Sequence, residues 1–184
     1  AVVASPSSCP CPHCPRHRVS DAQQLKPIMV PLRRSGGAPT FSGRRSGAKT
    51  PQRNSHPKMI DLHCHLLPGI DDGASDLAMS LNMARALVAD GVLVAACTPH
   101  ILPGLYHNTG PQIRTAIASL QHTLNEHGIP LHLVAGADNH IVPDFVGGLK
   151  SGHLLTLAES RYVLVEPPHH VPPQRMEEFF FTIQ

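Results

Sequence analysis

The chain changes character after residue 58, and this change limits how much of it can form a packed core. Residues 1–58 contain ten Lys/Arg residues, nine prolines and a single acid, whereas residues 59–184 contain five Lys/Arg residues and twelve acids. A segment so rich in Pro, Ser, Gly and Arg buries too little apolar surface to offset the conformational entropy lost on folding. We therefore predict a disordered basic leader over residues 1–58 and a folded unit over residues 59–184.

The length of the folded unit restricts the architectures open to it. Its 126 residues suffice for a stable domain, but a complete (β/α) barrel uses about 250 residues. The sequence contains no apolar run long enough to cross a membrane as a helix, so no transmembrane span is expected.

The leader carries features that could indicate a function. Cys9, Cys11, His13 and Cys14 offer soft ligands to zinc, but no second ligand pair follows at zinc-finger spacing, so we expect only adventitious binding. Its arginines could contact phosphates, but no aromatic residues alternate with them for base stacking, so nucleic acid is not an expected partner. The Arg-rich, acid-poor composition is typical of a transit peptide, and a start misassigned upstream of Met59 explains it equally well.

From Met59 onward the sequence alternates between strand-like and helix-like segments. Strands are expected at Met59–Leu62, Val92–Thr98, Leu131–Ala135 and Tyr162–Val165. Helices are expected from an N-cap at Ser75 up to Asp90, from Pro111 up to His127, over Pro143–Gly152 and over Gln174–Ile183, with a loop over Pro99–Gly110. Strands that alternate with crossover helices run parallel, so the predicted fold class is α/β.

Ligand-type side chains follow every predicted strand. In chain order they are His63 and His65 with Asp71 and Asp72, then His100, then Asp138, and finally Glu166. Residues two apart in an extended segment point to the same side, so His63 and His65 can bind one ion. Parallel strands present their carboxyl ends at one edge, where α/β proteins place their chemistry. The sequence therefore predicts a polynuclear metal site, whose mixture of imidazole and carboxylate suits Zn, Mn, Fe or Ni.

The remaining histidines and the usual protein nucleophiles give little evidence for a second kind of site. Four histidines are expected to be ordinary surface or core residues, namely His122, His127, His132 and His153, and four are left open, namely His107, His140, His169 and His170. None of the five cysteines is followed six residues later by the arginine that a cysteine phosphatase needs. No Gly-x-Ser-x-Gly elbow, Walker loop or dinucleotide motif occurs either, so metal-activated water is the remaining nucleophile.

Four motifs occur in a recognisable order in residues 59–184. Met59–Ala74 contains Asp-Leu-His-Cys-His followed by an Asp-Asp pair, and it precedes Cys97–His100, Val134–Asp138 and Ser160–Glu166. Together they resemble the motifs of the PHP (polymerase and histidinol phosphatase) superfamily. More closely, they are similar to those of the bacterial manganese-dependent protein-tyrosine phosphatases of the CpsB/CapC type. The resemblance covers none of residues 1–58.

The resemblance implies a distorted (β/α)7 barrel that holds two or three divalent ions, commonly Mn²⁺, with Zn²⁺ or Fe²⁺ as alternatives. It also implies a cytoplasmic enzyme that hydrolyses phosphotyrosine on a tyrosine kinase regulating capsular or exopolysaccharide synthesis, by attack of metal-activated hydroxide on phosphorus. The metal ligands that it implies are His63, His65, Asp72, His100, Asp138 and Glu166. Of these, Asp72 and His100 are also the implied catalytic residues, and Asp72 rather than Asp71 is the acidic ligand.

The sequence departs from the family pattern in two respects. Asp138 stands where the family usually has glutamate, and its shorter side chain reaches less far toward an ion. The chain also ends at Gln184, before the family's later histidine, phosphate-binding arginines and terminal Asp-x-His, so we expect a truncated chain with an incomplete active site. Two alternatives stay open: a PHP phosphatase acting on a substrate such as histidinol phosphate, and a catalytically silent metal-binding or interaction module.

Overall fold

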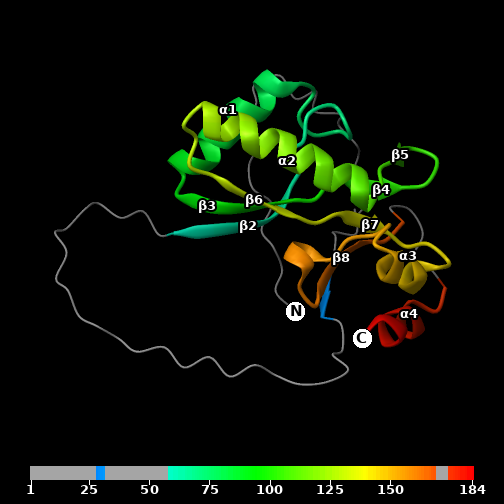
Figure 1. The fold of residues 1–184 in the computed structure, drawn as a ribbon. Coiled ribbons are helices and arrows are strands. Elements are labelled where there is room, and N and C mark those ends of the chain that lie inside the picture. Colours follow the sequence, from blue (N-terminus) through cyan, green and yellow to red (C-terminus); the bar gives the residue numbers. More distant parts are fainter. Residues whose placement is uncertain (1–27, 32–57, 169–173) are drawn as a thin grey trace, which may run out of the picture.

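A computed structural model of the chain describes residues 28–31, 58–168 and 174–184. Its elements in chain order are β1 (Ile28–Pro31), β2 (Met59–Cys64), α1 (Leu77–Ala89), β3 (Val92–Cys97), β4 (His100–Leu102), β5 (Tyr106–His107), α2 (Gly110–Glu126), β6 (His132–Ala135), β7 (Asp138–His140), α3 (Phe145–Ser151), a 3₁₀ turn at Leu157–Glu159, β8 (Tyr162–Glu166) and α4 (Met176–Ile183). Figure 1 shows their arrangement. No helix among these residues is long and apolar enough to cross a bilayer.

The strands form two sheets, and the chain passes from one sheet to the other. One has the order β2-β3-β6 and the other the order β1-β8-β7-β4-β5. Only two residues separate β3 from β4, and only two separate β6 from β7, so the chain passes twice from the first sheet into the second. The pairs β2–β3, β3–β6, β4–β7 and β7–β8 are all parallel. The predicted α/β class is therefore confirmed, and strands that follow one another along the chain lie side by side.

Two long helices cover the three-stranded sheet. Helix α1 packs against β3 and α2 against β6, and Figure 1 shows both on the same side of that sheet. The buried residues of α2 recur at helical spacing and include Ile113, Ile117, Leu120 and Leu124. Helices α3 and α4 contact each other through Phe145 and Phe179, whose rings pack edge to face with their centroids 5.1 Å apart. All four helices lie where the sequence predicts them.

The N-terminus of α1 differs from the prediction by one residue. The cap is Asp76 rather than Ser75, because the Asp76 carboxylate accepts a 2.8 Å hydrogen bond from the backbone N–H of Met79. This bond also lowers the pKa of Asp76. Ser75 instead donates its hydroxyl proton to the Asp76 carboxylate at 3.1 Å. A carboxylate one residue further along the chain therefore takes the role that the hydroxyl was expected to play.

Three short strands occur where the sequence predicts loop. Strands β4 and β5 lie within the expected loop Pro99–Gly110, and β7 follows the expected end of the third strand. Each is two or three residues long and depends on distant partners, since β4 pairs with both β5 and β7 and β7 also pairs with β8. Local sequence patterns carry little information about such short strands, because tertiary pairing determines them.

The leader also contributes one strand. Residues Ile28–Pro31 form β1, which pairs antiparallel with β8, and Met29 packs against a small apolar cluster of Ala96, Leu157 and Leu164. For these four residues the prediction of disorder is therefore wrong, because an edge strand needs only a few residues to complete a backbone ladder. Apart from Lys58, the rest of the leader, including the cysteine cluster and the arginines, lies outside the described residues.

A buried asparagine fixes β7 in the second sheet. Asn139 is fully buried, and its side-chain amide donates to the carbonyls of Leu155 and Leu164 while its oxygen accepts the backbone N–H of Leu155. The amide thus joins β7 to β8 and to the segment between them. Because neighbouring residues in a strand point to opposite faces, this anchor directs Asp138 and His140 away from it, to the other face of the sheet.

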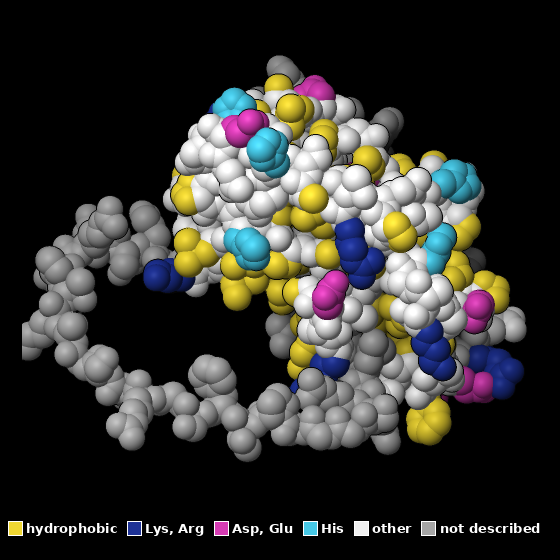
Figure 2. Space-filling model, viewed as in Figure 1, with side chains coloured by type: hydrophobic (Ala, Val, Ile, Leu, Met, Phe, Trp, Pro, Cys, Tyr) yellow, Lys and Arg dark blue, Asp and Glu magenta, His cyan; other side chains and the backbone are white. Residues whose placement is uncertain are grey.

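The first sheet exposes apolar side chains at its β2 edge. Strand β2 is an edge strand of its sheet in the described residues, and Met59, Ile60 and Leu62 on it are all exposed, as is Leu93 on β3. Figure 2 shows hydrophobic side chains gathered along this edge of the molecule. An edge of this kind can accept a further strand.

Candidate metal centre

The end of strand β2 and the residue that follows it present two imidazoles on one face. His63 and His65 are two residues apart, and their Nε2 atoms lie 3.0 Å from each other. Cys64 between them points the opposite way, into the apolar core. Thr98 holds this strand end in place, because its hydroxyl oxygen accepts the backbone N–H of Cys64 at 3.0 Å and its own N–H donates to the Cys64 carbonyl at 2.9 Å.

The loop after β2 brings two carboxylates to these imidazoles, and they play different parts. The side chain of Asp71 is buried, and it accepts a hydrogen bond from His65 Nδ1 at 2.8 Å, which directs Nε2 toward His63. Asp72 is largely exposed and lies 3.6 Å from His65 Nδ1. The tight path of the loop requires Gly73, because a Cβ there would lie 2.2 Å from the carbonyl oxygen of His65. Asp71 therefore orients a candidate ligand, and Asp72 faces the open side.

His100 lies between the open and the buried carboxylates. Its Nε2 is 3.4 Å from Asp72 and its Nδ1 is 3.0 Å from Glu166 and 3.7 Å from Asp138. Burial by itself would lower the pKa of His100, but the contacts with these carboxylates more than offset burial and raise the pKa to about 10. The same contact with His100 lowers the pKa of Asp72. In the protein without metal, this imidazole is therefore protonated on both nitrogens and positively charged at neutral pH.

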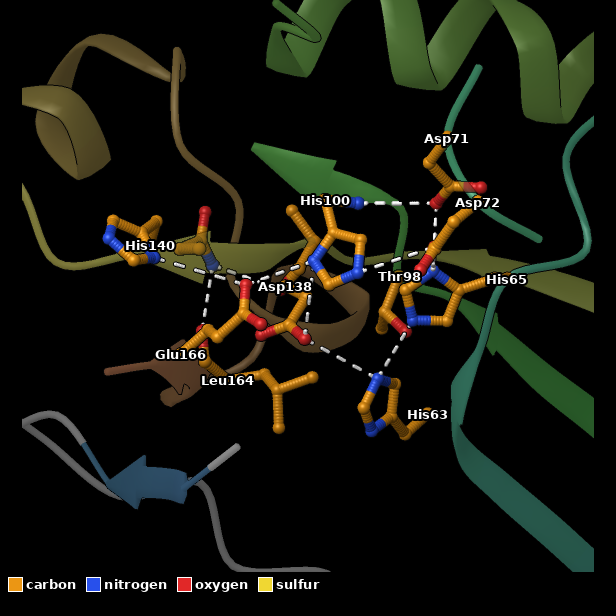
Figure 3. A network of polar contacts seen from close by, with 12 residues as sticks. His63, His65, Asp71, Asp72, Thr98, His100, Asp138, His140, Leu164 and Glu166 are labelled. Carbon is orange, nitrogen blue, oxygen red and sulfur yellow. Dashed lines mark hydrogen bonds and ion pairs between the residues drawn. The ribbon is translucent and has the colours of Figure 1, made fainter. Parts of the chain in front are cut away.

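Two carboxylates form the deep end of the site. Asp138 begins β7 and Glu166 ends β8, and the strand register places Asp138 beside His100 and Glu166 beside His140. Their side chains are only 1% and 6% exposed. Asp138 also lies 3.5 Å from Nε2 of His63, so it connects the imidazole pair of β2 to the second sheet. Figure 3 shows these side chains pointing toward one another from β2, β4, β7 and β8.

Three overlapping groups of these side chains could each hold an ion. They are His63 with His65 and Asp138, His65 with Asp72 and His100, and His100 with Asp138 and Glu166, and within each group the ligand atoms lie within 4.8 Å of one another. A neutral imidazole offers one lone pair, so His65 and His100 can each serve only one ion at a time. The groups are therefore neighbouring positions that compete for these two histidines, and only the shared Asp138 carboxylate can bind ions at two positions at once.

The donor set fits divalent transition metals. Two imidazole nitrogens bound to one ion at about 2.0–2.2 Å lie roughly 3 Å apart, and the His63 and His65 nitrogens are 3.0 Å apart. Burial and the neighbouring imidazoles lower the pKa of His63 to about 4, so its ring is neutral and can donate a lone pair at neutral pH. Imidazoles combined with carboxylates suit Zn, Mn or Fe, whereas a dedicated Ca²⁺ site uses oxygen alone.

The structure brings all six predicted ligands together. His63, His65, Asp72, His100, Asp138 and Glu166 each belong to at least one of the three groups. Four histidines expected to be ordinary residues are exposed and outside these groups, namely His122, His127, His132 and His153. Of the histidines left open, His107 is exposed, and His140 lies 4.0 Å from Glu166 at the margin of the site. His169 and His170 lie outside the described residues.

Sequence reasoning missed residues that orient the ligands. The sequence predicts Asp72 rather than Asp71 as the acidic ligand, and the pattern of strand ends gives no indication that Asp71 orients His65. Thr98 lies inside the motif Cys97–His100, but its bonds to Cys64 depend on the pairing of β2 with β3. The only available signal was the position of both residues inside recognisable motifs.

Comparisons with known proteins agree with this geometry. The family described as "Capsular polysaccharide synthesis, CpsB/CapC" matches residues 59–180. Tyrosine-protein phosphatase YwqE of Bacillus subtilis is 39% identical over 126 residues, which are 68% of this chain and 50% of that protein. Putative tyrosine-protein phosphatase CapC of Staphylococcus aureus is 25% identical over 126 residues, which are 68% of this chain and 49% of that protein.

A solved structure shares the fold. It belongs to a study of YwqE from Bacillus subtilis and CpsB from Streptococcus pneumoniae, described as unique metal-dependent tyrosine phosphatases. The match has a TM-score of 0.65 and 40% sequence identity, and it covers 68% of this chain and 51% of that one. The chain thus spans about half the length of the relatives it matches. The family match over residues 59–180 and the shared fold show that the chain belongs to the CpsB/CapC family of capsular polysaccharide synthesis.

Proposed function

We propose that the protein is a metal-dependent protein-tyrosine phosphatase whose substrate is a bacterial tyrosine kinase that regulates capsular or exopolysaccharide synthesis. The observation that carries this proposal is that two ligand groups, His63 with His65 and Asp138 and His100 with Asp138 and Glu166, meet at one carboxylate, that of Asp138. A carboxylate can bind one ion through each of its oxygens, so Asp138 can hold two ions close together, which is the arrangement that phosphoryl transfer uses. The names of the relatives supply the substrate class, phosphotyrosine, and the polysaccharide context.

The chemistry of such a site divides between the ions and the protein. Clustered divalent ions, when bound, lower the pKa of water toward 7 and neutralise the phosphoryl oxygens. We propose that His63, His65, Asp72, His100, Asp138 and Glu166 hold these ions, with Mn²⁺ as the metal. Asp71 keeps His65 in the orientation that presents Nε2 to the ion. Asp72, the most exposed of the acids, lies at the side from which substrate can enter and contacts His100. Asp72 and His100 are therefore the proposed catalytic pair.

We also propose that the complete fold is the distorted (β/α)7 barrel of the PHP superfamily. Two observations support it. The succession β2, β3–β4, β6–β7 and β8 places consecutive parallel strands side by side, as a singly wound barrel requires. The exposed apolar edge at β2 is the position where a closing strand would pair.

The proposed setting is the cytoplasm. A tyrosine kinase phosphorylates its targets there, because ATP is available on that side of the membrane.

The proposal is tested by measuring phosphate release from three substrates in parallel: a phosphotyrosine peptide, histidinol phosphate and a phosphoserine peptide. Turnover of the phosphotyrosine peptide that requires Mn²⁺, stops with chelator and disappears in His63→Ala supports it. His132→Ala is the matched control, since His132 is an exposed histidine outside the three groups. Preference for histidinol phosphate would instead indicate another PHP phosphatase, and metal binding without turnover would indicate a metal-binding module.

A further inference from the structure

Asn108 joins the two segments that carry Asp72 and His100. It lies between β5 and α2, and its side chain is partly buried. Its amide nitrogen donates one hydrogen bond to the carbonyl oxygen of Ile70 and one to the carbonyl oxygen of His100, both at 2.9 Å. Ile70 immediately precedes Asp71 and Asp72 in the loop after β2. One side chain therefore connects the loop of the first sheet to a strand of the second.

These bonds complete a closed ring around the backbone of His100. On the other side of the same residue, the His100 N–H donates to the Asp71 carboxylate at 3.2 Å. Asp71 follows Ile70 directly, so the path runs from Asn108 to Ile70, through Asp71 to His100, and back to Asn108. The N–H and the C=O of His100 are both fixed by this ring, which limits movement of β4 relative to the loop.

The ring needs the chemistry of a primary amide. Two carbonyl oxygens must be served by one short side chain, and the Asn amide nitrogen has two N–H donors. An aspartate would present oxygen atoms to both carbonyls and repel them. A serine could serve only one of the two carbonyls. The two bonds therefore depend on asparagine itself rather than on any polar residue.

We infer that Asn108 is a positioning residue of the metal centre, which sets the spacing between Asp72 on the loop and His100 on β4. The inference rests on the proposed metal centre but not on the identity of the phosphorylated substrate. Loss of the amide lets the loop and β4 separate, so the group formed by His65, Asp72 and His100 loses its geometry. Residues that orient metal ligands in this way typically change metal affinity by about 10–100-fold when replaced.

The test is a titration of the full chain with Mn²⁺. Binding is measured as the decrease in the electron paramagnetic resonance signal of free Mn²⁺. Mn²⁺ is chosen because it prefers imidazole and carboxylate ligands over the thiols of the leader. Asn108→Leu, which is close in size and has no donors, should weaken Mn²⁺ binding by about 10–100-fold. Asn108→Ser retains one donor and should show an intermediate loss. Asn82→Ala is the matched control, because Asn82 lies on the exposed face of α1 and contacts only Arg85 at 3.1 Å among the hydrogen bonds described.

Chemical unfolding in chelator separates positioning from general stability. If the variants unfold earlier without metal but bind Mn²⁺ as tightly as the wild type when folded, Asn108 has a merely structural role and the inference is overturned. Should Asn108→Leu fail to fold, Asn108→Ser decides the question, since wild-type affinity in that variant also contradicts the inference. Absence of saturable Mn²⁺ binding in the wild type overturns the metal centre together with this role. Normal binding without phosphotyrosine turnover refutes only the proposed function.

Discussion

The two ends of the candidate metal centre differ in how far water reaches them. At the deep end the side chains of Asp138 and Glu166 are 1% and 6% exposed, whereas at the open end Asp72 is 61% exposed. A carboxylate buried away from water is costly unless a cation or a set of hydrogen bonds compensates it. The deep end therefore depends most strongly on a bound ion, and the open end is the side that can exchange ligands with water and substrate.

The largest expected effect comes from the deep end. Asp138→Asn removes a carboxylate shared by two of the three groups while keeping the size of the side chain. We expect Mn²⁺ affinity, measured by isothermal titration, to fall by more than the roughly 100-fold upper range for residues that only orient ligands. If Asp138→Asn and Asp72→Asn reduced Mn²⁺ affinity by the same factor, the difference in burial between the two ends would have no effect on metal binding.

The next effect concerns His100, which lies between both ends. Its pKa is raised to about 10 in the metal-free protein, so between pH 8 and pH 6 an ion that binds this imidazole must displace a proton. Apparent Mn²⁺ affinity should therefore fall by about tenfold per pH unit as the pH decreases. His63, with a pKa of about 4, is already neutral over this range and adds no dependence. An affinity independent of pH would exclude His100 as a ligand.

A smaller effect is expected at the open end. Asp72→Asn keeps the size of the side chain and removes a ligand from only one group, and water can replace the lost oxygen because the position is exposed. We expect Mn²⁺ affinity to fall by about tenfold, near the lower limit for residues that support a metal site. Turnover should fall further than affinity, because Asp72 also contacts His100. Equal losses of affinity and turnover would remove Asp72 from the proposed catalytic pair.

The smallest effect is expected from thiol modification. Cys64 and Cys97 are buried, and burial raises the pKa of the Cys97 thiol, which makes the reactive thiolate scarce. Iodoacetamide should leave both residues unmodified in the folded protein and leave Mn²⁺ affinity unchanged, as checked by peptide mass spectrometry and titration. Rapid alkylation of either cysteine, with loss of metal binding, would contradict the burial of Cys64 on β2 and Cys97 on β3.

The candidate ligands could be predicted from the sequence because their positions follow from a general rule. Parallel strands present their carboxyl ends at one edge, so His63, His100, Asp138 and Glu166 are brought together once the strands are recognised. The four helices could be predicted for a similar reason, since their apolar residues recur at helical spacing.

The residues that orient the ligands could not be predicted in this way. Whether Asp71 or Asp72 faces His65 depends on the path of a loop that passes close to β2 at Gly73. Asn108 is a single polar residue in a segment expected to be loop, and its two partners lie 38 and 8 residues away in sequence. The pairing of β1 with β8 likewise depends on a distant strand edge. These contacts are set by tertiary structure, which no local pattern encodes.

The central claim is that the strand-end side chains, rather than the cysteines of the leader, form the metal site of this chain. The most direct test counts bound Mn²⁺ ions by electron paramagnetic resonance in the wild type, in a His63→Ala/His65→Ala double variant and in a Cys9→Ser/Cys11→Ser/Cys14→Ser triple variant. The account predicts saturable binding of at least one ion per chain that persists in the cysteine variant and is lost in the histidine variant. Binding that survives the loss of both histidines would contradict it.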